Sequence, residues 1–130
     1  MPVINSIAGF ADEMRGWRHH LHQHPELGLD CHKTAEYVVD RLREFGITEI
    51  HTGIDQSGVV AIIEGKGAGP TIGLRADMDD ALPMTETSGV DWASKTPGHM
   101  HACGHDGIPQ CCLGPRNTLL KRKIFQVVWP

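Results

Sequence analysis

The order of the sequence patterns along the chain constrains the fold more than any other feature. Residues 5–23 and 33–45 each carry apolar side chains at helical spacing, and Pro25 and Gly28 interrupt the helical pattern between them. Gly46 is a natural stop for the second helix. Because β-rich runs follow the two helices, the sequence predicts an α/β layer. The apolar stripes are Ile7, Phe10, Met14, Trp17 and Leu21, then Ala35, Val38, Val39, Leu42 and Phe45.

Three short runs rich in β-branched and apolar residues follow the helices, at 49–54, 58–65 and 71–77. The link "GKGAGP" between the last two runs is typical of a turn, so these two runs are expected to pair as a hairpin. The next segment, 80–102, predicts an irregular connection because it contains Pro83, Gly89, Pro97 and Gly98.

Composition excludes several classes of protein. The 130 residues suit one domain, and 40% hydrophobic with 22% charged residues is ordinary for a globular chain. The net charge of −4 gives no electrostatic reason to expect nucleic acid or an anionic membrane as a partner. No run reaches transmembrane length. The four cysteines include an adjacent pair, and no secretory signal is recognised, so we expect a cytoplasmic protein with reduced thiols.

The stretch "GLRADMDDALP" places Asp77, Asp79 and Asp80 at the end of an apolar run. Acids at the carboxyl end of a sheet strand lie where α/β folds place ligand-handling groups. An Asp after a strand is also commonly part of a solvated turn. Three acids in four residues make a site more plausible, but both interpretations stay open.

The stretch "HACGHDG" contains two candidate metal ligands. Cys103 and His105 are two residues apart, so an extended segment presents both side chains on one face. Thiolate and imidazole are good ligands for zinc and other late divalent metals, and Asp106 could orient His105. The alternative is a buried cysteine beside a surface histidine, because a closed metal site needs three or four ligands.

The histidines of "WRHHLHQHPELG" raise the same choice. His20 and His24 are four residues apart, a spacing at which a helix can present two imidazoles to one metal ion. Such a pair is more often a polar helix face or a set of caps, so a structural role is the alternative.

Taken together, "WRHHLHQHPELG", "GLRADMDDALP" and "MHACGHDG", in this order and at these separations, resemble the M20 peptidase family. The nearest subgroup is the amidohydrolases typified by hippurate hydrolase, N-acyl amino acid amidohydrolase and auxin-conjugate hydrolases. The resemblance covers about residues 3–107. It implies that residues 1–107 are the N-terminal portion of an α/β catalytic domain, with an incomplete mixed sheet, flanking helices and no lid domain, which often mediates dimerisation in the family.

The resemblance also implies roles for residues. Cys103 and His105 correspond to metal ligands and Asp77 to the active-site acid, with a supporting role for Asp106. In such enzymes two divalent ions (zinc, manganese, nickel or cobalt) activate a water that attacks the amide carbon of a small N-acyl amino acid. The family's Glu-Glu pair and later histidine ligands have no counterpart here. This chain is therefore expected to be inactive or nearly so, and Val59–Ile63 to expose apolar surface meant for missing strands.

Two departures from the family pattern stand out. The family usually reads D-M-D-A-L-P, whereas this chain has one extra Asp between Met78 and Ala81. From Ile108 onward, "IPQCCLGPRNTLLKRKIFQVVWP" shows no sustained helical or alternating period, whereas the family has a histidine and then an amphipathic helix. Residues 108–130 are thus interpreted as an aberrant tail.

A shift of the reading frame explains this tail. If one C was lost after a GGC codon for Gly107, restoring it allows residues 108–130 to be re-read as H-T-A-M-L-L-G-A-A-K-Y-L-A-E-T-Q-N-F-S-G-x-V-A. That string contains the missing histidine and an amphipathic helix. Sequencing the coding DNA is expected to show the codons that this reading requires; other codons would remove the hypothesis.

Two other classes of function remain open from the sequence. One is a small Cys/His metal-binding module without catalysis, which would hold a stoichiometric ion that is lost on Cys103→Ala. The other is an interaction fragment whose basic residues, Lys121, Arg122 and Lys123, touch a partner. Because the lid is not in the sequence, no oligomeric state is predicted.

Overall fold

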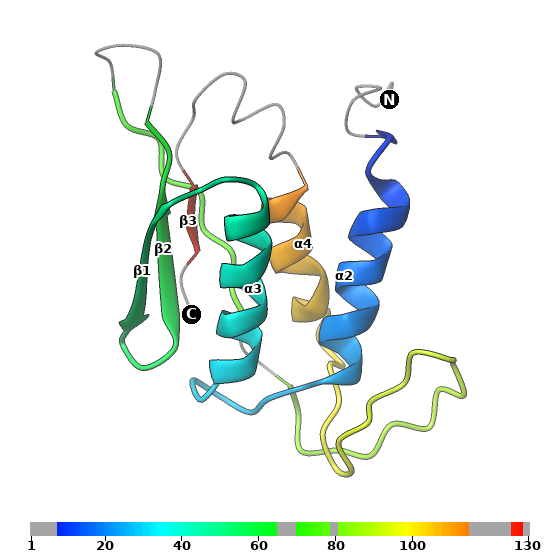
Figure 1. Ribbon diagram of the computed structural model, residues 1–130. Coiled ribbons are helices and arrows are strands. Elements are labelled where there is room, and N and C mark those ends of the chain that lie inside the picture. The colour runs from blue at the N-terminus through cyan, green and yellow to red at the C-terminus, as the bar shows by residue number, and fades with distance from the viewer. Residues whose placement is uncertain (1–7, 65–69, 79–80, 115–125, 129–130) are drawn as a thin grey trace.

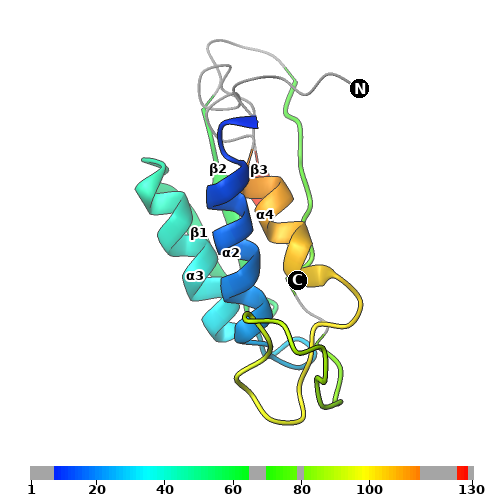
Figure 2. The same ribbon diagram turned by 90° about the vertical axis from the view of Figure 1, so that its right-hand side faces the viewer.

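The computed structural model describes residues 8–64, 70–78, 81–114 and 126–128, and it has the predicted α/β architecture (Figure 1). Helix α3 packs against the sheet, and α4 contacts both α3 and α2 (Figure 1). In the view of Figure 2, α3 and α4 are seen on either side of α2. The elements are α2 Ala11–Gln23, α3 His32–Glu44, β1 Glu49–Ile54, β2 Gly58–Ile62, the 3-10 helix η1 His105–Gly107, α4 Ile108–Leu113 and β3 Gln126–Val128.

Both predicted helices are confirmed, with slightly shorter bounds. Each turns its apolar stripe inward, and the rings of Trp17 on α2 and Phe45 after α3 lie 5.7 Å apart. Helix α2 ends before Pro25, whose missing N–H cannot continue it, and Gly46 follows α3 with a φ of 79°. Ile7, predicted for the first stripe, lies outside the described residues.

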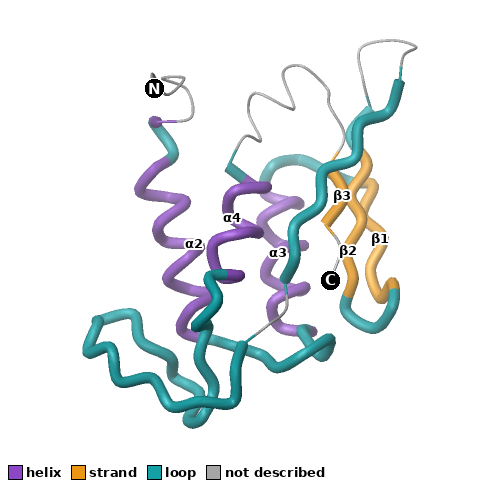
Figure 3. Tube along the Cα trace, turned by 180° about the vertical axis from the view of Figure 1, so that it is seen from behind, coloured by secondary structure: helices purple, strands orange, loops and turns teal. Residues whose placement is uncertain are grey.

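The predicted strand pairing is wrong. The hairpin forms between β1 and β2, which are antiparallel and joined by a turn in which Asp55 and Gln56 have positive φ. Strand β3 pairs with the other edge of β2, so the order is β1-β2-β3. Because both edges of β2 are occupied, residues 70–78 have no place beside it, and they run as an extended coil that lies in front of the helices in the view of Figure 3.

The core lies between the sheet and the helices. It includes Val59, Ala61 and Ile63, so the expectation that β2 exposes its apolar residues is wrong for these side chains, which α3 and its neighbours cover. The coil 70–78 also contributes, because Ala76 and Met78 point inward and alternate with the more exposed Arg75 and Asp77.

Residues 81–102 form the irregular connection that their prolines and glycines predict, fastened by a bridge between Leu82 and Met100. The segment 108–114 differs from prediction, since α4 is a regular helix with Pro109 in its first turn and Leu113 in the core. Strand β3 lies further along the same tail.

Candidate functional site

The motif "HACGHDG" forms a tight turn that leads into α4. Gly104 has a φ of 95°, a left-handed conformation that a side chain would disfavour, and the amide of Gly107 donates a 2.9 Å hydrogen bond to the Gly104 carbonyl. The intervening residues make up η1, which packs against α2. The turn therefore places Cys103 and His105 close to the helix that carries "WRHHLHQHPELG".

Asp106 is the buried member of this turn, with its side chain 1% exposed. Its Oδ2 accepts hydrogen bonds from Arg18 Nε at 3.1 Å and from His22 Nδ1 at 2.9 Å. Its Oδ1 has no hydrogen-bond partner among the described residues. Because an ionised carboxylate is costly to bury without a compensating charge, the two partners on α2 account for the stability of this arrangement.

His22 also reaches a second carboxylate. Its Nε2 lies 3.2 Å from Glu86 Oε1, and Glu86 in turn accepts hydrogen bonds from the Ser88 hydroxyl and from the Ser94 amide at 2.6 Å. An ionised carboxylate can only accept, so both contacts are satisfied when both ring nitrogens of His22 carry hydrogen. We refer to Arg18, His22, Glu86 and Asp106 as the α2 clamp.

The pKa of Glu86 is lowered from its ordinary value of 4.5. Burial acts in the opposite direction and raises the pKa, but the hydrogen bonds from Ser88, Ser94 and His22 outweigh it. The unfolded chain therefore takes up a proton at a higher pH than the folded chain does. The contribution of Glu86 to stability is complete above the unfolded pKa and is lost as the pH falls through the folded pKa.

This shift leads to a prediction for acid unfolding. In Glu86→Gln, the free energy of unfolding measured by urea titration should fall less between about pH 6 and about pH 3.5 than in the original chain. Glu64→Gln, the same change at an exposed position, should leave the pH dependence as it is. Parallel pH curves for the Glu86 variant and the original chain would contradict the assignment.

The structure does not bring the three predicted site residues together as a metal centre. Cys103 is exposed and His105 is half-buried in the turn, whereas Asp77 Oδ1 accepts a 2.8 Å hydrogen bond from Arg75 Nε. Within the described ranges, no group of three or more His, Cys, Asp or Glu side chains could hold a metal ion. Cys103 and His105 thus have the right donor chemistry for zinc, but their number is too small for a complete site.

Sequence reasoning missed most of the α2 clamp. Arg18 and His22 are four residues apart, so they lie on one face of α2, and this spacing was the available signal. Glu86 carried no signal, because 64 positions separate it from His22. Further contacts fasten residues 81–102 to α2. The rings of His19 and Trp92 stack at 4.1 Å, and Lys95 donates from its amide to the Gln23 carbonyl and from its Nζ to Gln23 Oε1.

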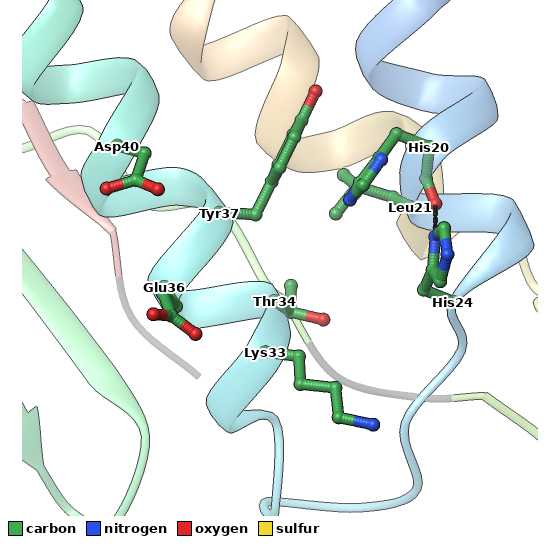
Figure 4. A pocket seen from close by; sticks show the side chains of 8 residues that line it. All are labelled: His20, Leu21, His24, Lys33, Thr34, Glu36, Tyr37 and Asp40. Atoms are coloured by element: carbon green, nitrogen blue, oxygen red, sulfur yellow. Dashed lines mark hydrogen bonds between the residues drawn. The ribbon is translucent and has the colours of Figure 1, made fainter.

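A separate groove of about 260 Å³ lies between α2 and α3 (Figure 4). In it, the ring of His20 stacks on Tyr37 with centroids 4.0 Å apart, and His24 Nδ1 donates to the His20 carbonyl oxygen at 2.7 Å. Burial lowers the pKa of His20, helped by the nearby charges of His24, Arg41 and Lys95. These contacts join the helices and close the end of α2, which favours the structural interpretation of the His20–His24 pair.

No helix among the described residues is long and apolar enough to cross a membrane.

Comparison with known proteins finds relatives that match most of this chain. The N-acyl-L-amino acid amidohydrolase of Geobacillus stearothermophilus is 47% identical over 112 residues, covering 83% of this chain and 30% of that protein. A solved structure, the Bacillus subtilis YXEP protein, a dinuclear metal binding peptidase from the M20 family, matches with a TM-score of 0.81 and 38% identity over 89% of this chain and 32% of that one. The chain is homologous to M20-family hydrolases.

Other M20-type relatives agree. The hippurate hydrolase of Campylobacter jejuni is 43% identical over 107 residues, which are 82% of this chain and 27% of that protein. The chain therefore spans about 30% of the length of the relatives it matches. No family model matches the chain. The M20 homology confirms the resemblance and the fold class inferred from the three motifs.

Proposed function

We propose that this sequence belongs to a metal-dependent amidohydrolase that cleaves the amide bond of N-acyl amino acids. The observation that carries the proposal is the 47% identity with a relative whose name states this activity. The similarity to a dinuclear metal binding peptidase supports divalent metal as the cofactor. The substrate is then a small molecule, neither nucleic acid nor membrane.

In this proposal Cys103 and His105 are metal ligands and Asp77 is the active-site acid. Thiolate and imidazole suit zinc, and a bound divalent ion would supply polarisation of the amide carbonyl and of an attacking water. Asp77 is half-exposed at the end of an inward-packed segment, where its carboxylate is accessible apart from the contact with Arg75. Residues 1–107 then correspond to catalytic-domain sequence and 108–130 to a frame-shifted tail.

We further propose that the 130-residue chain by itself has little or no activity. The two donors in the turn have no third metal-binding partner among the described residues. Since catalytic zinc sites use three protein ligands and an open position, two ligands leave the ion weakly held. A general base positioned beside a bound water is also required for the proton transfers of amide hydrolysis.

The test incubates the purified chain with hippurate and with N-acetyl amino acids in the presence of zinc, manganese, nickel or cobalt, and measures released amino acid. We expect no release above the blank, whereas the Geobacillus stearothermophilus relative serves as the positive control. Metal-dependent release that disappears on Cys103→Ala would contradict the inactivity and support the ligand role. If the coding DNA continues in the restored frame, its longer product is expected to be active and to lose activity on the same substitution.

A further inference from the structure

Helix α2 carries two residues that donate to the same carboxylate oxygen in the turn formed by the motif "HACGHDG". Arg18 and His22 lie one helical turn apart, and both donate to Asp106 Oδ2. We propose that Arg18 and His22 are positioning residues, which hold the turn 103–107 in place through their hydrogen bonds to Asp106. The relevance of this positioning to metal binding rests on the proposed function; the positioning itself does not.

The covalent geometry of the turn makes Asp106 an effective point of attachment. Asp106 directly follows His105 inside η1, and the hydrogen bond from the Gly107 amide to the Gly104 carbonyl spans both residues. With the backbone closed by this bond, fixing the Asp106 side chain also limits rotation about the His105 backbone, and Cys103 enters the closed turn through Gly104. The Cys103 side chain is exposed, so packing against other side chains does not fix its position.

His22 is in turn fixed from its other side. Its Nε2 is hydrogen-bonded to Glu86, and Glu86 in turn accepts hydrogen bonds from the Ser88 hydroxyl and from the Ser94 amide. The imidazole therefore has a carboxylate at each nitrogen, which fixes its ring orientation as well as its position. Arg18 is half-exposed and contributes a positive charge and one directional hydrogen bond. Its replacement should therefore lower the free energy of unfolding less than replacement of the buried His22 does.

A role in positioning differs from a general role in stability, because its loss acts more strongly on the turn than on the rest of the fold. The readout is amide hydrogen exchange by NMR, comparing the Gly107 amide with amides inside α3, such as that of Leu42. In His22→Gln and Arg18→Gln, we expect exchange of the Gly107 amide to accelerate by a factor at least about tenfold larger than the acceleration of the α3 amides. The matched control is His24→Gln, the same change at a side chain that bonds only the His20 carbonyl.

Two outcomes would overturn the proposal. One is unchanged exchange of Gly107 in both variants. The other is acceleration of Gly107 and α3 amides by the same factor, which would mean that the clamp only stabilises the whole fold. If His22→Gln does not fold, Arg18→Gln decides alone, since Arg18 is half-exposed.

A second measurement separates this proposal from the proposed function. Excess Co²⁺ is added, and the thiolate-to-cobalt charge-transfer band is followed, with Cys103→Ala as the blank. We expect a band that requires Cys103 and weakens at least about tenfold in apparent affinity in His22→Gln. No Cys103-dependent band in the original chain would contradict the ligand role, while the exchange data would still decide the positioning.

Discussion

Leu42→Ala is expected to lower the free energy of unfolding by about 3 kcal/mol. Leu42 is 0% exposed and belongs to the cluster where α3 meets β2. Removing its branched end deletes apolar contacts and leaves a cavity that the rigid helix cannot close. A small domain has roughly 5–15 kcal/mol of stability, so this loss is a large share of the total and should be clear in a urea titration.

Leu29→Ala is the control for this change, because the same atoms are removed from a side chain that is 42% exposed. We expect its free energy of unfolding to stay within about 0.5 kcal/mol of that of the original chain. Equal losses for the two variants would contradict the described core. An unchanged free energy of unfolding in Leu42→Ala would also contradict it.

Asp106→Asn is expected to lower the free energy of unfolding by about 3 kcal/mol. The amide keeps the shape and an acceptor oxygen, so the effect isolates the negative charge. Without that charge, Arg18 and His22 lose the buried carboxylate to which both donate, and a neutral amide oxygen is a weaker acceptor for them. Chemical denaturation near neutral pH measures the change.

Asp12→Asn makes the same replacement in an exposed ion pair. Asp12 lies 2.8 Å from Arg15, but their side chains are 91% and 62% exposed, so water and salt screen the pair. Its loss should cost less than about 1 kcal/mol. A larger loss for Asp12→Asn than for Asp106→Asn would refute the assignment of Asp106 as a buried carboxylate that the α2 clamp holds.

The helices could be predicted from the sequence because their periodicity shows directly which face is buried. Val38 and Leu42 recur at helical spacing, and both are fully buried. Strand pairing could not be predicted in the same way, since a period of two shows the face of a strand but not its neighbour. Residues 71–77 keep the alternation, yet both edges of β2 are taken by β1 and β3.

The candidate site shows a similar division. Cys103 and His105 attract attention by residue type and spacing, and their role as metal ligands stays a prediction. What orients the turn depends on contacts across long stretches of sequence, such as the 84 positions between His22 and Asp106. No local pattern encodes such a contact, so His22 could not be distinguished from its neighbouring histidines before the structure was known.

The outer edge of β1 has a consequence for how copies of this chain behave at high concentration. In the described part of the chain β1 pairs on one side only, which leaves backbone amides and carbonyls available to a second molecule. Its pairing register shifts between Thr52 and Ile54, and Gly53 there has a φ of 74°, so the ribbon is bent. The bend, with Glu49 and His51 on an exposed strand, opposes edge-to-edge stacking into fibrils.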